Sequence, residues 1–311
     1  MDKVRDNENK TGSSARVLIP VDFSQKGSLA LKVGFELARR LGREATLIHA
    51  SVVPDPTSMP EFPDTFNGID NEEVEIEEVE MDREIHEIDS RSMDNLKKKI
   101  EKLQEAGTFP AIKFNTVLAP GMPEEVIAEY CAMTPPSVVV MATRGREKRH
   151  EELIGSVTAE VIDHCVAPVL TVPEDYTFSG FKEIERICAF CYFDDSCLEA
   201  VRKLMEMFGR PEVRIYLFPA TDKLKGEERQ KALEVIRGKL MAQFPNSEFI
   251  IDTDAAGKNL REEAENLFVK KDIQMILAPN RHRNALARFF NPGLPHKILY
   301  EIDFPMLAIP V

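Results

Sequence analysis

The sequence predicts an α/β protein with two repeated doubly wound domains, each holding a five-stranded parallel sheet. Short apolar runs rich in β-branched residues alternate along the chain with segments whose apolar residues recur at helical spacing. The whole alternation occurs twice, and the two closing segments, CVAPVLTVP and DFPMLAIP, line up. Such an alternation is typical of parallel sheets, and ligands are then expected beyond the carboxyl ends of the strands.

The first half begins with the strand RVLIPVD, residues 16–22, whose continuous apolar run suits burial on both faces. A helix follows from the expected cap Ser24 to Gly42, a residue that favours a helix stop. The further expected elements are a strand at 45–53, a helix ending near Gly107, a strand at 111–118, a helix at 122–133, a strand at 137–143, a helix at 156–164 and a strand at 167–173.

An acidic insertion is expected at about 54–90, between the second strand and its helix. From Asp70 to Asp89 the chain carries eleven acidic residues against one basic residue, Arg83, and this segment supplies most of the net charge of −13. The simplest interpretation is a solvated segment that leads into a helix from about residue 80; a regulatory contact with a basic partner is the alternative. The apolar face expected for this helix consists of Ile85, Ile88, Leu96, Ile100 and Leu103.

The second half repeats the pattern after a short linker. Its expected strands are at 185–195, 213–220, 247–254, 273–280 and 305–311, and its expected helices are at 196–209, 227–244 and 259–271. The predicted organisation is a disordered N-terminus at 1–14, a first domain at 15–175, a linker at 176–183 and a second domain at 184–311.

Composition narrows the class of protein. No apolar run is long enough to cross a membrane and no export segment opens the chain, so the expected location is the cytoplasm. The acidic balance argues against nucleic-acid binding. Five cysteines, an odd number, indicate reduced thiols. Cys188 and Cys191 form a CxxC, but residues three apart on a strand point to opposite faces, which favours burial over a redox or zinc pair.

The stretch ATRGREKRHEELIGS, residues 142–156, carries the candidate ligand site. Gly145 is followed by nine residues and then by Gly155 and Ser156, where a helix is expected to begin. Backbone approaches a phosphate closely only where no Cβ intervenes, and a helix N-terminus favours an anion. The alternative is a charged surface turn with glycines at its ends.

At these residues the chain resembles the universal stress protein family, in particular its tandem members with two such domains. The resemblance runs along almost all of residues 15–311, and it rests on PVDFS, on LIHA and above all on MATRG with GSVTAEVIDHCVAPVLTVP. It implies the adenine nucleotide alpha hydrolase-like fold. The family signature is Gly-x-x-Gly, nine residues, then Gly-Ser or Gly-Thr, and here Ala142 stands in place of the first glycine.

The resemblance implies a site for ATP or a related adenine nucleotide in the first domain, with Mg²⁺ held mainly by the phosphates. Pro20 and Asp22 would lie against the adenosine, and the backbone of Ala50 would contact the adenine edge. The positions that would line the phosphates are Met141, Ala142, Gly145, Gly155, Ser156 and Val157.

Two site residues leave alternatives open. Ala142 costs only space if its φ is negative, but it is strained if its φ is positive. Asp22 either contacts the ligand or caps the first helix.

The second domain is expected to be degenerate. Counting from Ala278 by the same spacing puts Arg281 in place of Gly145 and Asn291-Pro292 in place of Gly155-Ser156, and proline lacks an amide donor.

The leading hypothesis is a stress-response protein that binds the nucleotide as a sensing or regulatory ligand, while the second domain has a structural or assembly role. No nucleophile–base set recurs at interpretable spacing, so nothing in the sequence requires catalysis. A non-nucleotide interaction module and a slow ATPase are the alternatives. Besides the nucleotide, the interactions to be considered are a protein partner and a homodimer.

Overall fold

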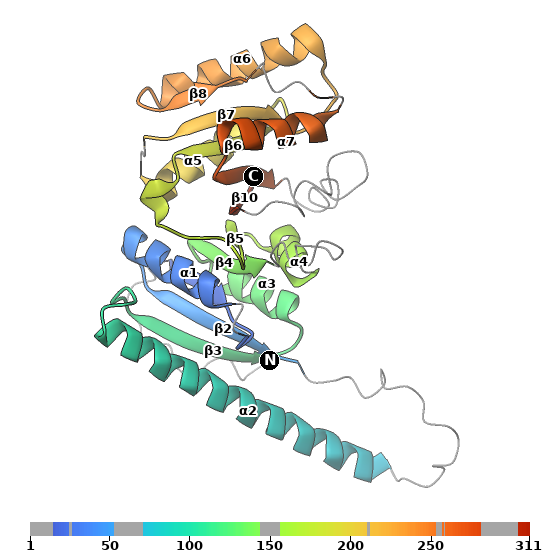
Figure 1. Cartoon of the computed structure of the whole chain (residues 1–311). Coiled ribbons are helices and arrows are strands. Elements are labelled where there is room, and N and C mark those ends of the chain that lie inside the picture. Colours follow the sequence, from blue (N-terminus) through green and yellow to red (C-terminus); the bar gives the residue numbers. More distant parts are fainter. Residues whose placement is uncertain are drawn as a thin grey trace.

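The computed structural model describes residues 15–24, 27–52, 71–143, 156–209, 212–252, 257, 259–280 and 304–311. The strands are β1 Val17–Pro20, β2 Ala45–Ser51, β3 Phe114–Pro120, β4 Val138–Thr143, β5 Val169–Pro173, β6 Arg186–Cys191, β7 Arg214–Pro219, β8 Glu248–Ile250, β9 Met275–Asn280 and β10 Met306–Pro310 (Figure 1). The helices are α1 Ser28–Leu41, α2 Asn71–Glu105, α3 Pro123–Met133, α4 Ser156–His164, α5 Ser196–Phe208, α6 Gly226–Gln243 and α7 Leu260–Lys271, with a 3-10 turn, η3, at Phe181–Glu183.

All of these strands belong to a single ten-stranded sheet of order β3-β2-β1-β4-β5-β10-β9-β6-β7-β8. Within each half the strands are parallel and follow the same order, which confirms the predicted α/β class. The two five-stranded sheets are not separate, because β10 pairs antiparallel with β5, with Leu307 opposite Leu170. This pairing satisfies backbone groups that would otherwise stay open at two sheet edges, and it points the carboxyl ends of the two halves in opposite directions.

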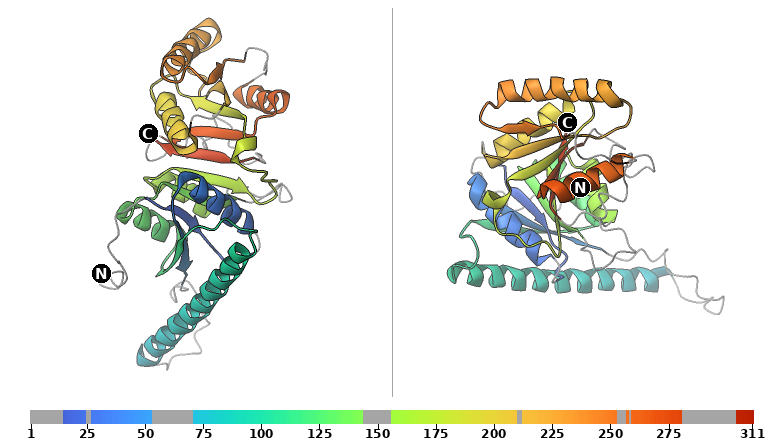
Figure 2. Two further views of the ribbon diagram at one scale, coloured as in Figure 1. Left: turned by 90° about the vertical axis from the view of Figure 1, so that its left-hand side faces the viewer. Right: turned by 45° about the horizontal axis from the view of Figure 1, so that its top comes forward.

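Helices cover both faces of the sheet (Figures 1 and 2). On one face, α1, α2, α5 and α6 contribute to a single buried cluster that runs through both halves. On the other face, α3, α4 and α7 contribute to a second cluster that also spans both halves. The two halves therefore share their cores, and unfolding one half would expose apolar surface of the other.

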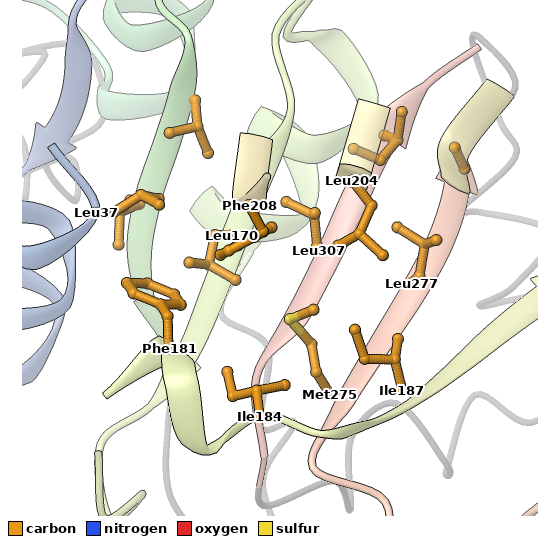
Figure 3. Packing of buried hydrophobic residues seen from close by; sticks show 14 of the residues in the cluster. Leu37, Leu170, Phe181, Ile184, Ile187, Leu204, Phe208, Met275, Leu277 and Leu307 are labelled. Atoms are coloured by element: carbon orange, nitrogen blue, oxygen red, sulfur yellow. The ribbon is translucent and has the colours of Figure 1, made fainter. Parts of the chain in front are cut away.

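Figure 3 shows the first of these clusters where the halves meet. Leu37 of α1 and Leu170 of β5 lie on one side, and Phe208 of α5 and Leu307 of β10 lie on the other. The expected linker takes part in this packing, because Phe181 of η3 is 7% exposed and its ring centroid lies 5.2 Å from that of Phe208. The linker thus packs as part of the core.

Hydrogen bonds cross the same boundary. Asn280, at the end of β9, is 5% exposed, and its Nδ2 donates to the carbonyl oxygen of Ile162 in α4 over 2.5 Å. The last carbonyls of a helix have no partner within that helix, so the second half satisfies one of them in α4. On the other face, Arg40 of α1 donates from Nη2 to the carbonyl of Phe208 over 2.5 Å.

Helix α2 begins earlier than the sequence predicted. It starts at Asn71, so the acidic run from this residue on is helical, and its N-terminal part extends beyond the sheet (Figures 1 and 2). The predicted apolar face is wrong at Ile88, which is 59% exposed, because Met93 and Ile100 form the buried contact with the sheet. Within the part of the chain that the structure describes, no helix is both long and apolar enough to cross a bilayer.

All of the cysteines are buried and none forms a disulfide. Cys188 belongs to one buried cluster and Cys191 to the other, which confirms that the CxxC residues face opposite sides of the sheet. Burial raises the pKa of both thiols well above the ordinary value. A hydrogen bond between Cys131 and Cys165 raises the pKa of Cys131 and lowers that of Cys165.

We expect the cysteines to resist alkylation in the folded protein. Only the thiolate reacts, and both the burial of Cys188 and Cys191 and their raised pKa values keep them protonated at neutral pH. Mass spectrometry after a short iodoacetamide treatment should find these two residues unmodified, whereas the same treatment in guanidinium chloride should modify all five cysteines. Rapid labelling of the CxxC in the folded state would contradict their placement in the core.

Two glycines in helices provide a matched test of the packing. Gly34 of α1 lies against β1, and an added Cβ would be 2.5 Å from Cδ1 of the fully buried Ile19. We expect Gly34→Ala to lower the free energy of unfolding by about 1–3 kcal/mol through overpacking. The control is Gly238→Ala in α6, where no atom lies within 4 Å of the added Cβ. This control should raise the free energy of unfolding by about 0.5–1 kcal/mol, as measured by urea denaturation.

Candidate functional site

The strand order gathers the predicted adenosine residues at one edge of the sheet. β1 lies between β2 and β4, and these three strands are parallel, so their carboxyl ends meet there. Pro20 is the last residue of β1, Ala50 is near the end of β2, and Met141 and Ala142 are near the end of β4. Met141 is 6% exposed, whereas the other three side chains are half-buried. A ligand at this edge would therefore meet small side chains and backbone.

The conformation of Ala142 removes one of the two alternatives for this residue. It lies within β4 and pairs in register with Val172 of β5. Among the described residues other than glycine, positive φ is confined to Phe23, Phe193 and Asp272. The methyl group of Ala142 thus occupies space without straining the backbone.

Of the predicted phosphate-lining residues that follow Ala142, the structure describes Ser156 and Val157. Gly145 and Gly155 lie outside the described residues. Ser156 is the first residue of α4, and the half-buried Val157 packs against the apolar cluster on that face of the sheet. The first amide groups of α4 have no partner within the helix, and they lie at its positive end.

Asp22 forms a turn directly after β1. Its Oδ1 accepts a hydrogen bond from the backbone N–H of Ser24 over 3.0 Å. Helix α1 begins only at Ser28, with Gly27 at its N-cap position and no side-chain cap. Asp22 therefore does not cap the helix, and its exposed carboxylate lies at the edge where the ligand is expected.

His49 is a further residue of this edge, and sequence reasoning missed it. Its Nδ1 lies 2.7 Å from the carbonyl oxygen of Val21, and its ring centroid lies 4.2 Å from that of Phe23. Its Nε2 lies 3.4 Å from Oδ2 of Asp89 in α2. The signal in the sequence was the histidine of LIHA, one of the polar residues of its strand, which stands near the carboxyl end.

The second half differs chemically at the corresponding edge. The backbone N–H of Ser137, just before β4, donates to the carbonyl of Arg16 over 2.8 Å. The backbone N–H of Gln274, just before β9, donates to the carbonyl of Arg186 over 2.9 Å. Arg16 and Arg186 therefore occupy equivalent positions in the two halves. In this register Tyr192, and neither Asp194 nor Asp195, corresponds to Asp22.

The same comparison of hydrogen bonds shifts the predicted alignment of β4 with β9 by one residue. Glu174 donates to the carbonyl of Thr143, and Val311 donates to that of Asn280, which makes Thr143 and Asn280 equivalent. Pro279 rather than Ala278 therefore corresponds to Ala142. The expected loop positions Arg281, Asn291 and Pro292 lie outside the described residues.

Among the described residues, no three His, Cys, Asp or Glu side chains are grouped so that they could hold a metal ion.

Comparisons with known proteins identify the family of the chain. The model of the universal stress protein family matches residues 14–173. A universal stress protein of Methanocaldococcus jannaschii is 28% identical over 163 residues, which are 50% of this chain and 93% of that protein.

Two solved structures resemble the fold along nearly the whole chain. A universal stress protein from Archaeoglobus fulgidus has a TM-score of 0.63 at 15% identity, with 95% of this chain and 98% of that chain covered. A protein of unknown function from Pseudomonas aeruginosa has a TM-score of 0.53 at 12% identity, with 96% and 93% covered. With the family model matching more than half of its residues, the chain belongs to the universal stress protein family.

Proposed function

We propose that the first half of this universal stress protein binds ATP or a related adenine nucleotide as a sensing ligand. The observation that carries the proposal is the meeting of the Asp22 turn with the ends of β2 and β4 at one edge of the sheet. In parallel α/β sheets, ligands bind at the carboxyl ends of the strands, where loops and helix N-termini converge.

Each predicted residue has a role that its position allows. Pro20 and the exposed carboxylate of Asp22 would contact the adenosine, with Asp22 accepting hydrogen bonds from ribose hydroxyls or the base. Ala50 would contact the adenine edge through its backbone. Met141, Ala142, Gly145, Gly155, Ser156 and Val157 would line the phosphates.

The negative charge of the phosphates would be offset by backbone amide groups and by a bound Mg²⁺. The amide groups at the start of α4 would donate to phosphate oxygens, since a helix N-terminus favours an anion. Mg²⁺ would be held mainly by the phosphates themselves, because its preferred ligands are oxygen atoms of phosphate and water.

The mechanism would be a shift between conformations. Nucleotide would bind along residues 142–156 and so change the conformation and the surface that the neighbouring elements present to a partner. The second half would support the first through the shared cores and the contact of Asn280 with α4. We place this activity in the cytoplasm, and a closed homodimer is the assembly that we would test first.

Removing Gly155 should remove nucleotide binding. A valine at this position places a branched side chain where the backbone would approach a phosphate. Calorimetric titration with ATP and Mg²⁺ should detect binding to the native protein and none to Gly155→Val. Gly238→Val, at an open position in α6, should bind like the native protein. Absence of nucleotide binding by the native protein at millimolar concentration would favour the interaction module instead.

Restoring the family glycine should change affinity little. Because Ala142 lies in a strand and adds only a methyl group, we expect Ala142→Gly to bind ATP within about threefold of the native protein, less than 1 kcal/mol. The same titration measures this difference. If the native protein binds nothing and the glycine variant binds ATP, the methyl group blocks the site and the nucleotide proposal fails for this chain.

A further inference from the structure

We propose that His49 is a positioning residue that ties the Asp22 turn to helix α2, so that α2 regulates the affinity of the first-half site. The regulatory part of this inference rests on the proposed nucleotide binding. The structural part, that His49 and Asp89 together hold the turn, stands on the contacts alone.

The imidazole of His49 contacts the chain on both sides of Asp22. On one side, its Nδ1 donates to the carbonyl of Val21 over 2.7 Å, while the N–H of Val21 donates to Ile48 over 2.9 Å. On the other side, the ring of Phe23 packs against it at 4.2 Å. Phe23 has a φ of 58°, in the left-handed region that a bulky residue rarely adopts without surrounding support. His49 thus contacts the backbone just before Asp22 and the side chain just after it.

Asp89 fixes the imidazole from the other direction. Its Oδ2 lies 3.4 Å from Nε2 of His49, and the two side chains are only 16% and 14% exposed. Both neighbours of the ring, the carbonyl of Val21 and the carboxylate of Asp89, are hydrogen-bond acceptors. The carboxylate therefore holds the ring in the orientation that reaches Val21.

Asp89 lies near the place where α2 reaches the sheet. The helix has 35 residues and is about 52 Å long at 1.5 Å per residue. The neighbouring strand β2 has 7 residues and spans about 23 Å. Figures 1 and 2 show the excess length as an N-terminal part of α2 that extends beyond the sheet. A displacement of that part would act on the Asp22 turn through Asp89 and His49.

The second half contains the same turn without this contact. Phe193 corresponds to Phe23 and also has positive φ, at 67°. In the shared register, however, Pro219 replaces His49, just as Tyr192 replaces Asp22. Proline has no side-chain donor, so the second half keeps the turn and lacks the connection. The histidine thus accompanies the aspartate that is expected to contact the ligand, which supports a role in positioning it.

The test combines hydrogen–deuterium exchange with nucleotide titration on the full chain. The variants are Asp89→Ala and His49→Ala, with Asp89→Asn as the conservative variant, because the amide oxygen of asparagine still accepts a hydrogen bond. Asp94→Ala removes an exposed aspartate from the same helix and serves as the control. Exchange at the β4 amides verifies that each variant is folded.

Without nucleotide, Asp89→Ala and His49→Ala should speed exchange of the Val21 and Ser24 amides, whereas the control should not. The Val21 amide donates to the carbonyl of Ile48 in β2, and the Ser24 amide donates to Oδ1 of Asp22. With ATP and Mg²⁺, Asp89→Ala should bind about three- to tenfold more weakly, the range expected for a residue coupled to a site that it does not touch. Asp89→Asn should restore most of this affinity, and nucleotide should slow exchange at residues 83–93 of α2 in the native protein.

The two arms separate the possible failures. Unchanged exchange at Ser24 in both alanine variants would overturn the structural part, whatever the protein binds. If the native protein binds ATP and Asp89→Ala binds it equally tightly, regulation by α2 is overturned while the nucleotide site stands. If the native protein binds no nucleotide, the proposed function and the regulation fail together, and faster exchange in the variants would still support the His49 contact.

Discussion

The antiparallel pairing of β5 with β10 is the constraint on which the rest of the structure depends. It joins two parallel half-sheets into one, and it buries Leu170 and Leu307 opposite each other in a core that neither half could complete alone. Because the pairing is antiparallel, the carboxyl ends of the two halves face opposite directions. The carboxyl edge of the first half, with Asp22 and Ala142, is thereby kept apart from that of the second half, where Tyr192 and Pro279 stand at the corresponding positions.

The same pairing brings the second half into contact with a helix of the first. It brings Asn280 to the C-terminal end of α4, the helix whose first residues are expected to contact phosphate. A helix of nine residues gains little stability from its own hydrogen bonds, so it depends on packing and on partners for its ends. The second half thus contributes to the packing and hydrogen bonding that hold this helix in place.

The contacts of His49 connect helix α2 to the carboxyl end of β1. The acidic run of α2 is remote from the nucleotide residues in sequence, but Asp89 lies at its end and reaches the Asp22 turn through one side chain. The charge pattern of α2 and the chemistry of the site therefore belong to one connected structure. A mostly buried pair is suited to this role, because an exposed pair would be screened and would hold no fixed geometry.

Hydrophobic periodicity by itself determined the order and type of the elements and the bounds of α4, and strand geometry determined the opposite faces of Cys188 and Cys191, because these features are local. The sequence also determined which stretch carries the glycine pattern. Only the tertiary structure decided that the two sheets are one, that Ala142 is unstrained, that Ile88 is exposed and that Tyr192 corresponds to Asp22. Those features depend on pairing between residues far apart in the chain, and a local pattern of apolar and polar residues carries no information about which edges or side chains meet.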